Sequence, residues 1–525
     1  MRRPRNIALA VALLVATSFI GTTAKAGDLN VSGLYQQHCA SCHGGDRLGG
    51  TGPAMLPENL KRLRKKKASA VIANGRPATQ MPGFAAKLNK GQIDALVDHI
   101  YTPLPFVPEW SLAKIKKSHV IHNQPGDLPA QVQHGSGPLN LFTVVETGDH
   151  HVTILDGDTF EPIWRFQSHF ALHGGAKYSP DGRFVYLASR DGWVSKHDLW
   201  NLKPVADIRV GINTRNIAVS SDGKWVMAGN FLPHTLVVLN AHDLSPFRII
   251  PVDDGEGVTS RVSAVYDARP RQSFIVALKD VKQVWELSYD PDAEPIYANF
   301  VHSYQQGQVE GLILHDQPFG IRRIETEDYL DDFFFNPTYT ELMGAARNSK
   351  KGVVYNLNVR RKIADLDLSS MPHLGSGIVW NYQGRQVMAT PHLKENAVSV
   401  IDMNSWKTIK RIETLGPGFF MRSHENTPYA WVDVFFGKNR DAVHVIDKQT
   451  LEIVKTLRPE PGKTAAHVEF TRDGRYALLS IWDMDGALVV YDAATLEEIK
   501  RIPMKKPSGK YNVFNKTRLS TGTSH

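Results

Sequence analysis

The sequence predicts a small all-α domain followed by an all-β propeller of eight blades. Three observations predict this order. Apolar residues recur at helical spacing up to about residue 101, a β-rich texture with Asp-Gly turns begins near residue 138, and from there a pattern repeats about every 40 residues. A four-stranded propeller blade needs a repeat of about this length. With 525 residues, 42% apolar and 22% charged, the composition is that of a folded protein and excludes a disordered chain.

The N-terminus predicts export. Residues 1–26 begin with three arginines, continue with an apolar stretch from Ile7 to Ile20 and end in Ala24-Lys25-Ala26, the small-x-small pattern of a signal-peptidase site. We expect cleavage after residue 26 and a periplasmic location, with an uncleaved anchor as the alternative. Cleavage removes four positive and no acidic residues, so the net charge falls from +8 to +4. This weakens the case for nucleic-acid binding, and no other apolar segment is long enough to predict a membrane span.

The first expected domain, residues 27–108, reads as short helices. Residues 29–42 are apolar at helical spacing, and residues 92–101 repeat apolar side chains at i, i+3, i+4 and i+7. A proline-punctuated stretch over residues 103–108 ends this domain. Residues 109–137 are expected to form a linker.

The expected propeller, residues 138–525, contains Asp-Gly turns that lead into strands, as in Ser179–Ala188, Ser220–Gly229 and Thr471–Ser480. We expect eight units, beginning near residues 140, 174, 214, 261, 336, 375, 419 and 466. The first unit lacks an opening strand and the last leaves a spare one at residues 510–515. We therefore expect the tail to complete the first blade and close the ring, which removes an unpaired sheet edge. Residues 300–335 fit the repeat least well and are expected to form a loop over one face.

The chain's two cysteines stand in the motif Cys39-Ala-Ser-Cys42-His43. Two thiols at this spacing add across the vinyl groups of a heme, and the adjacent histidine becomes an axial ligand of its iron. Export, helical surroundings and the absence of other cysteines all agree with a covalently bound heme c. The motif therefore predicts a c-type cytochrome domain, with a disulfide beside an unrelated histidine as the alternative.

The second axial ligand of this heme is expected later in the same domain. Met81 is our candidate because it stands in the loop before the last predicted helix. A thioether ligand raises the potential of the iron and suits electron transfer. Met55, His38 and His99 are the alternatives.

A strongly basic run precedes that methionine: residues 61–67 carry six positive charges in seven positions. Two interpretations remain open. The run steers an acidic redox partner to the heme edge, or it is a solvated helix face.

An attached cytochrome only carries electrons, so we expect the propeller to hold the site that produces or consumes them. The order of c-type cytochrome, proline-rich linker and eight-unit propeller resembles cytochrome cd1 nitrite reductase and its relatives over nearly the whole mature chain. The segments similar to that family are Phe170–His173, Ser189–Asp191, Asp198–Trp200, Gly211–Arg215, Met371–Gly375, Thr390–Leu393 and Pro507–Phe514.

The resemblance implies roles for residues of the propeller. His173 is implied as the proximal iron ligand of a d1-type heme, and His373 as its distal ligand or a proton-transfer group. Arg190 and Arg215 would pair with the carboxylates of the tetrapyrrole, for which a planar guanidinium is well shaped. An ordinary inter-blade salt bridge is the alternative for both arginines. His392 lies in a similar motif and is expected to have a supporting or structural role.

Two departures from the nitrite reductase pattern decide the expected function. Those enzymes place two histidines over the distal face of heme d1; His373 matches one of them, but Asp331 or Asp332 stands where the other belongs. A carboxylate at neutral pH is an anion, which repels nitrite rather than protonating it. His467 occupies a position that resembles a cofactor-facing glutamine of the reductases. It is our candidate for a catalytic base or an orienting group, with a hydrogen-bonded blade histidine as the alternative.

This pattern resembles the dihydro-heme d1 dehydrogenases, cytochrome c-containing paralogues that complete heme d1 biosynthesis by oxidising a propionate side chain of dihydro-heme d1 to an acrylate. The resemblance implies that the electrons pass to heme c and then to a periplasmic electron acceptor. Apo nitrite reductase and other heme d1 assembly proteins are further candidate partners. The alternatives are a nitrite reductase that converts nitrite to nitric oxide, and a non-catalytic heme d1 carrier.

Overall fold

The computed structural model describes residues 29–518, except 62, 77–80, 295, 298–312, 316–317, 347–350 and 369–370. The expected signal peptide, residues 1–26, lies outside the described residues. Among those that are described, no helix is long and apolar enough to cross a membrane.

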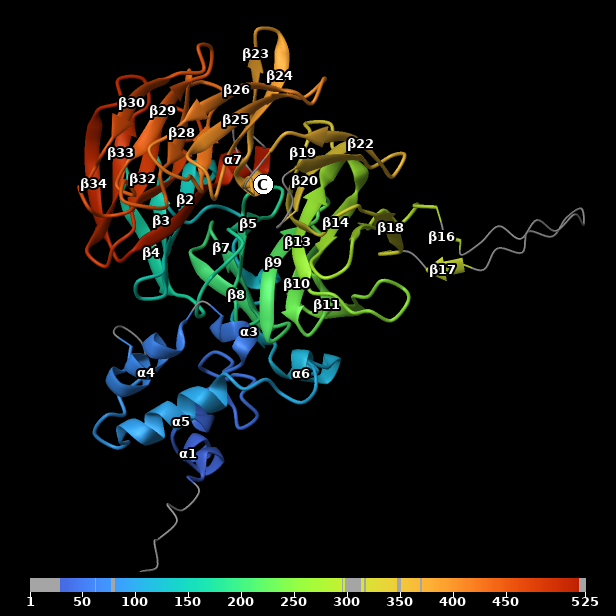
Figure 1. Cartoon of the computed structure of the whole chain (residues 1–525), viewed down its shortest axis with the longest axis vertical. Coiled ribbons are helices and arrows are strands. Elements are labelled where there is room, and N and C mark those ends of the chain that lie inside the picture. Colours follow the sequence, from blue (N-terminus) through green and yellow to red (C-terminus); the bar gives the residue numbers. More distant parts are fainter. Residues whose placement is uncertain are drawn as a thin grey trace, which may run out of the picture.

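The first part of the chain is helical and lies beside one side of the propeller (Figure 1). Its helices are α1 (Val31–His38), α2 (Ala40–His43), α3 (Pro57–Leu60), α4 (Lys65–Asn74) and α5 (Lys90–Ile100). The expected helical spacing is confirmed, because the buried side chains of α5 are those of Ile93, Leu96, Val97 and Ile100. These side chains form one apolar cluster with residues of α1 and α4.

The described remainder forms eight antiparallel sheets that surround a common axis, so the predicted fold class is confirmed (Figure 1). The first four blades are β35 (Pro507–Asn512), β2 (Leu141–Glu146), β3 (His151–Asp156) and β4 (Pro162–Gln167); β5 (Lys177–Tyr178), β6 (Phe184–Ala188), β7 (Trp193–Asp198) and β8 (Lys203–Arg209); β9 (Asn213–Val219), β10 (Trp225–Leu232), β11 (Thr235–Asn240) and β12 (Pro246–Pro251); β13 (Val262–Ala268), β14 (Ser273–Leu278), β15 (Gln283–Ser288) and β18 (Ile321–Glu325).

The last four blades are β19 (Leu330–Phe335), β20 (Glu341–Ala346), β21 (Gly352–Asn356) and β22 (Arg361–Leu366); β23 (Ile378–Tyr382), β24 (Arg385–Pro391), β25 (Ala397–Asp402) and β26 (Thr408–Glu413); β27 (Met421–Ser423), β28 (Tyr429–Asp433), β29 (Val443–Asp447) and β30 (Ile453–Leu457); β31 (Ala465–Phe470), β32 (Tyr476–Ile481), β33 (Gly486–Asp492) and β34 (Glu498–Met504). A separate two-stranded sheet joins β16 (Ile296–Tyr297) and β17 (Ile313–His315).

The tail of the chain closes the ring, as the sequence predicts. β35 pairs antiparallel with β2, so that Lys510 lies opposite Val144. The following helix α7 (Val513–Arg518) contacts β2 and β5 and lies near the centre of the ring (Figure 1). Val513 is fully buried in the apolar cluster between the first and second blades.

One expectation is wrong. Residues 330–335 are not a loop over one face; they form β19, which opens the fifth blade, so this blade begins at residue 330 rather than 336. Residues 321–325 of the expected loop form β18, the edge strand of the fourth blade. The register shifts between Leu330 and Asp332. This irregularity places two carboxylates between buried apolar residues and hides the alternation that marks a strand. Residues 298–312, in the rest of the expected loop, lie outside the described residues.

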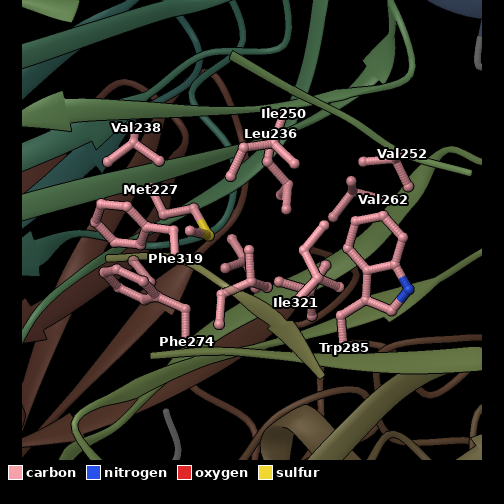
Figure 2. Packing of buried hydrophobic residues seen from close by; sticks show 14 of the residues in the cluster. Met227, Leu236, Val238, Ile250, Val252, Val262, Phe274, Trp285, Phe319 and Ile321 are labelled. Carbon is pink, nitrogen blue, oxygen red and sulfur yellow. The ribbon is translucent and has the colours of Figure 1, made fainter. Parts of the chain in front are cut away.

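Neighbouring blades are held together by buried apolar side chains. Figure 2 shows the cluster between the third and fourth blades, where Met227 and Leu236 of the one meet Phe274 and Trp285 of the other. All four side chains are fully buried. Such contacts join adjacent sheets face to face and fix the angle between them.

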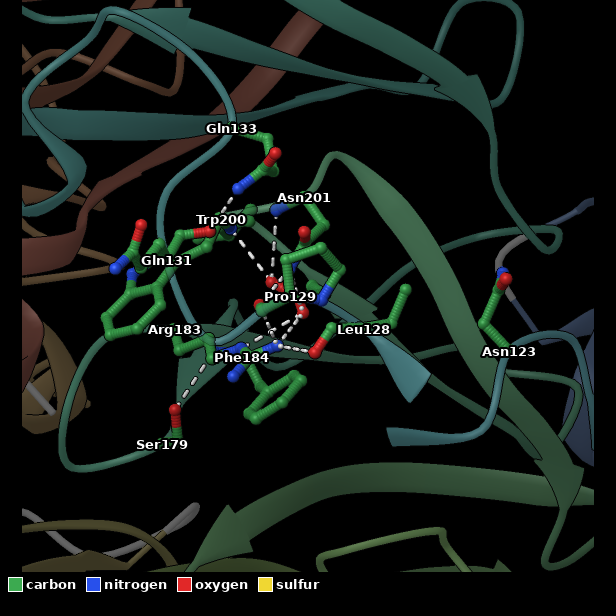
Figure 3. Close-up of polar contacts among 12 residues, drawn as sticks. Asn123, Leu128, Pro129, Gln131, Gln133, Ser179, Arg183, Phe184, Trp200 and Asn201 are labelled. Atoms are coloured by element: carbon green, nitrogen blue, oxygen red, sulfur yellow. Dashed lines mark hydrogen bonds and ion pairs between the residues drawn. The ribbon is translucent and has the colours of Figure 1, made fainter. Parts of the chain in front are cut away.

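Residues 109–137 are attached to the propeller along much of their length. They include α6 (Leu112–Lys117) and β1 (Val120–Ile121), and β1 pairs with β8 as a fifth strand of the second blade. Further along, the backbone oxygen of Pro129 accepts hydrogen bonds from Arg183 at 2.9 Å and from Asn201 at 3.0 Å (Figure 3). The expected linker is therefore built into the second blade.

The buried side chain of Arg209 connects the two domains. Its Nη2 donates to the backbone oxygen of Leu48 in the helical domain at 2.6 Å, and its Nε donates to the backbone oxygen of Asp191 in the second blade at 2.8 Å. The guanidinium also lies over the ring of Trp110, 4.5 Å from its centroid. These contacts fix the helical domain against the second blade.

Removing residues 507–525 should destabilise the protein strongly, because it exposes the hydrogen-bonding edge of β2 and the apolar cluster around Val513. We expect the thermal unfolding temperature, followed by circular dichroism, to fall by at least about 10 °C. A chain shortened by residues 519–525 alone is the matched control and should unfold at the wild-type temperature. Equal unfolding temperatures for the two shortened chains would contradict the closing role of β35 and α7.

Candidate functional site

A continuous cavity of about 2440 Å³ extends from the helical domain into the propeller. Seven of the nine predicted site residues line it: Cys39, Cys42, His43 and Met81 from the helical domain, and Arg190, Arg215 and His373 from the propeller. His173 and His467 do not line this cavity, although His173 contacts the lining residues Arg190 and Arg215. The structure thus brings two predicted heme-binding regions, far apart in sequence, to one space.

The two thiols and His43 lie close together in the chain, at the end of α1 and in α2. Cys39 and Cys42 are free cysteines at the junction of α1 and α2. His43 is 7% exposed, and its Nδ1 lies 2.8 Å from the backbone oxygen of Pro53. A carbonyl only accepts, so Nδ1 carries the proton and Nε2 keeps the lone pair that an iron would bind. Burial lowers the pKa of His43, which favours this neutral form.

Gly52 is a functional residue that sequence reasoning missed. A Cβ built at this position would lie 2.8 Å from Cε1 of the His43 ring. Any side chain at position 52 would therefore push the ring out of its place. The glycine stands in a stretch rich in glycine and proline, and only the fold reveals that it packs against the histidine.

Three of the four candidates for the second axial ligand line the cavity: Met81, Met55 and His38. His99 does not line it; its ring instead lies 5.4 Å from that of Tyr35, centroid to centroid. Met81 and Met55 also pack against the apolar cluster of the helical domain. The donor set around this end of the cavity, two thiols, one lone-pair nitrogen and a thioether, fits a covalent heme.

His173 lies between the two predicted arginines. Its Nδ1 is 2.8 Å from the backbone oxygen of Arg215 and therefore carries the proton. Its Nε2 accepts hydrogen bonds from Nη2 of Arg190 at 3.0 Å and from Nη1 of Arg215 at 2.9 Å. Nε2 is the atom that a proximal ligand offers to iron, so iron binding requires both guanidinium groups to leave it. Carboxylates of a tetrapyrrole in the cavity are groups to which they could turn.

His373 lies in the loop before the sixth blade and faces a carboxylate. Its Nδ1 donates to the backbone oxygen of Phe419 at 2.5 Å, and its Nε2 is 3.9 Å from Oδ2 of Asp332. Burial lowers the pKa of His373, and the neighbouring charge of Asp332 opposes this effect. His373 and Asp332 thus form a pair at the cavity wall that can hold or pass on a proton.

The structure distinguishes the two adjacent carboxylates that the sequence left open. Asp331 accepts a hydrogen bond from Nζ of Lys279 at 2.8 Å. Asp332 accepts one from the backbone of Gly375 at 2.6 Å, which directs it toward the His373 loop. Asp332 is therefore the residue that stands opposite the predicted distal histidine.

His467 has an unusual environment. It is 1% exposed, has a positive φ of 56° and lies at a register shift in β31. Its ring lies between those of Phe420 and Tyr511, with centroid distances of 4.6 and 5.2 Å. Among the described residues neither ring nitrogen has a hydrogen-bond partner. Burial lowers the pKa of His467 well below its usual value, with the nearby charge of Lys510 adding to the effect, so the ring is neutral at pH 7.

Asp433 is a second residue that sequence reasoning missed. Its carboxylate accepts hydrogen bonds from the backbone nitrogens of Phe419 at 2.7 Å, Phe420 at 3.0 Å and His467 at 3.2 Å. Burial raises its pKa to about 6. Because the oxygen of Phe419 orients His373, this one carboxylate supports both histidines. An aspartate at the end of a strand carries no sequence signal for such a role.

His392 is fully buried, and its Nε2 lies 2.8 Å from Oγ of Ser399. It does not line the cavity. This position agrees with the structural role rather than with contact to a ligand.

Comparisons with known proteins agree with the two-domain arrangement. The family model described as cytochrome D1 heme domain matches residues 136–312 and 307–516, and the model of the cbb3-type cytochrome c oxidase subunit III matches residues 29–100. The dihydro-heme d1 dehydrogenase of Pseudomonas aeruginosa is 54% identical over 521 residues, which cover 99% of this chain and 100% of that protein. The nitrite reductase of Stutzerimonas stutzeri is 25% identical over 536 residues, which cover 92% of each chain. A solved structure of a dihydro-heme d1 dehydrogenase in complex with DHE has 56% identity and a TM-score of 0.86, covering 92% of this chain and 99% of that chain.

Changing Gly52 to Ala should weaken heme ligation by His43, because the added Cβ displaces the ring that it would otherwise overlap. We expect the visible spectrum of the purified protein to lose part of its low-spin features. Gly126→Ala is the matched control, since a Cβ there meets nothing within 4 Å. An unchanged low-spin spectrum in Gly52→Ala would show that His43 does not need this close packing.

Proposed function

This chain belongs to the family of dihydro-heme d1 dehydrogenases, and we propose that it catalyses the last step of heme d1 biosynthesis. In this reaction a propionate side chain of dihydro-heme d1 becomes an acrylate. The carbon-carbon bond loses two electrons and two protons and becomes a double bond conjugated with the macrocycle. The observation that carries the proposal is the single cavity that the heme c motif shares with His373 and the two arginines, because it gives the electrons a short way out of the substrate.

The helical domain is proposed to hold the electron carrier. Cys39 and Cys42 attach heme c, His43 offers Nε2 as one axial ligand, and Met81 is proposed as the other. Heme c supplies one-electron transfer when bound. The chain itself keeps His43 neutral and oriented through Pro53.

The propeller is proposed to bind the tetrapyrrole substrate. His173 is proposed to ligate its iron through Nε2, with His373 on the opposite side. Arg190 and Arg215 are proposed to pair with its carboxylates. Both guanidinium groups already line the cavity, and their present hydrogen bonds to His173 keep these half-buried charges partnered until an anionic ligand enters.

Proton removal is assigned to His467. A base must be unprotonated before it acts, and burial keeps this ring neutral. Neither ring nitrogen has a partner among the described residues. The lone pair of the basic nitrogen is therefore not already accepting a hydrogen bond from the protein. The ring packs against Phe420 and does not line the cavity, so this role requires the substrate side chain to reach beyond the cavity wall. His373 and Asp332 are proposed to take part in passing the released protons on.

Asp332 argues against nitrite reduction as the main activity. A carboxylate 3.9 Å from Nε2 of His373 adds negative charge where an anionic substrate would have to bind and be protonated. The same charge is compatible with a substrate that must lose protons.

The protein is proposed to be exported and to work with partner proteins. Residues 1–26 are proposed to be a signal peptide, and the mature protein, with a cytochrome domain at 27–108, a linker at 109–137 and a propeller at 138–525, is proposed to act in the periplasm. A periplasmic electron acceptor is proposed to reoxidise heme c. Apo nitrite reductase or other heme d1 assembly proteins are proposed to receive the product.

The proposed reaction is tested by incubating the oxidised holoprotein with dihydro-heme d1 in the absence of oxygen. We expect a product lighter by two hydrogen atoms in mass spectrometry, with the absorption spectrum of heme d1. A pure carrier would leave the side chain saturated. Nitrite turnover with a reduced donor at a rate comparable to precursor oxidation would also contradict the proposal.

His467→Gln should slow the oxidation by about a hundredfold or more, because glutamine has a similar length but cannot act as a base at neutral pH. Binding of dihydro-heme d1, measured by spectral titration, should remain close to wild type. His392→Gln is the control, since it changes a buried histidine whose ring is hydrogen-bonded to Ser399 and to which no part in the reaction is assigned. A wild-type rate in His467→Gln would remove this residue from the mechanism.

A further inference from the structure

Four lysines line the cytochrome end of the cavity: Lys61, Lys87, Lys114 and Lys117. We refer to them as the lysine rim. They come from three separate parts of the chain, one directly after α3, one before α5 and two from α6. All four side chains are exposed. The fold therefore gathers positive charges from distant positions around the space that the heme c motif lines.

Salt bridges are formed by some lysines of this part of the chain and not by others, and among the described residues Lys66, Lys67 and Lys116, outside the rim, form none. Within the part of the chain that the structure describes, none of the four forms a salt bridge. By contrast, Lys65 pairs with Asp98 at 2.7 Å, and Lys90 pairs with Asp94 at 2.5 Å. The one close aromatic partner in the rim is Trp110, whose ring centroid lies 5.4 Å from Nζ of Lys114.

The acidic groups at this end of the cavity do not neutralise the rim. They are Asp46 and Glu58. The two carboxylates are outnumbered by the four rim lysines. The basic residues 64–67 follow closely in sequence and are exposed. The surface around the heme c motif is thus positive although the expected mature chain has a net charge of only +4.

We propose that the lysine rim is the docking surface of the electron acceptor, and that this acceptor is an acidic electron-transfer protein. The inference rests on the proposed function, in which heme c must be reoxidised. Heme c holds one electron at a time, whereas each side chain yields two, so the acceptor must be met twice per turnover. Complementary charge raises such encounter rates by about 10- to 1000-fold.

The test measures reoxidation of heme c directly. The holoprotein, without tetrapyrrole, is reduced chemically and mixed in a stopped-flow instrument with oxidised plastocyanin, an acidic blue-copper protein, or with a basic c-type cytochrome. The rim variant carries K61E, K87E, K114E and K117E. The matched control carries the same change in net charge on exposed lysines that do not line the cavity: K203E, K410E, K438E and K505E.

We expect the rim variant to reduce plastocyanin at least about 10-fold more slowly than wild type at low ionic strength, and the basic cytochrome faster. The difference should fall as salt screens the charges, where the Debye length is about 3 Å at 1 M. The control variant should stay near wild type. Equal rates of plastocyanin reduction by the rim and control variants, whether lowered or unchanged, would overturn the proposal. The lysine rim would then be an ordinary solvated surface.

This outcome is separable from that of the proposed function, because the heme is reduced chemically. A charge-dependent reoxidation with no oxidation of dihydro-heme d1 would retain the docking surface and refute the activity. The opposite result is that both variants oxidise dihydro-heme d1 with a small neutral oxidant and reduce plastocyanin at equal rates. It would retain the activity and refute the docking surface.

Discussion

The arrangement of the two domains depends on their direct contact, in which the hydrogen bond from Arg209 to Leu48 is joined by a buried apolar cluster around Leu48. The arginine belongs to the second blade, is 3% exposed and also donates to the backbone of Asp191. A buried cation needs such partners, because an unpaired one would cost more than the contact contributes. By tying the helical domain to the blade that carries Arg190, it allows one cavity to be bounded by both domains. Electron transfer between two tetrapyrroles requires this proximity.

Within the propeller, hydrogen bonds among polar groups hold the proposed site residues in place. His173 shares its lone pair with two guanidinium groups, and Asp433 fixes the backbone that supports His373 and His467. The neutral ring of His467 stands without a polar partner among the described residues. Such a group costs stability, and burial between aromatic rings keeps it neutral.

Much of this could be predicted from local patterns. The C-x-x-C-H motif needs only five adjacent residues, and the blade repeat follows from Asp-Gly turns and alternating strands. The predicted start of the fifth blade was wrong because a register shift between Leu330 and Asp332 breaks the alternation of apolar and polar residues that marks a strand. Gly52 and Asp433 could not be found, since their importance lies in contacts with residues that only the fold brings near. The choice between Asp331 and Asp332 likewise depends on Lys279 and Gly375, which lie far from them in sequence.

The central claim is that electrons from the substrate side chain pass to heme c. It is tested most directly by mixing dihydro-heme d1 with an excess of oxidised holoprotein, without oxygen or any acceptor, and following the reduction of heme c by absorption. The account predicts that two heme c groups become reduced for each acrylate formed, because each accepts one electron. Formation of the acrylate while heme c stays oxidised would contradict it.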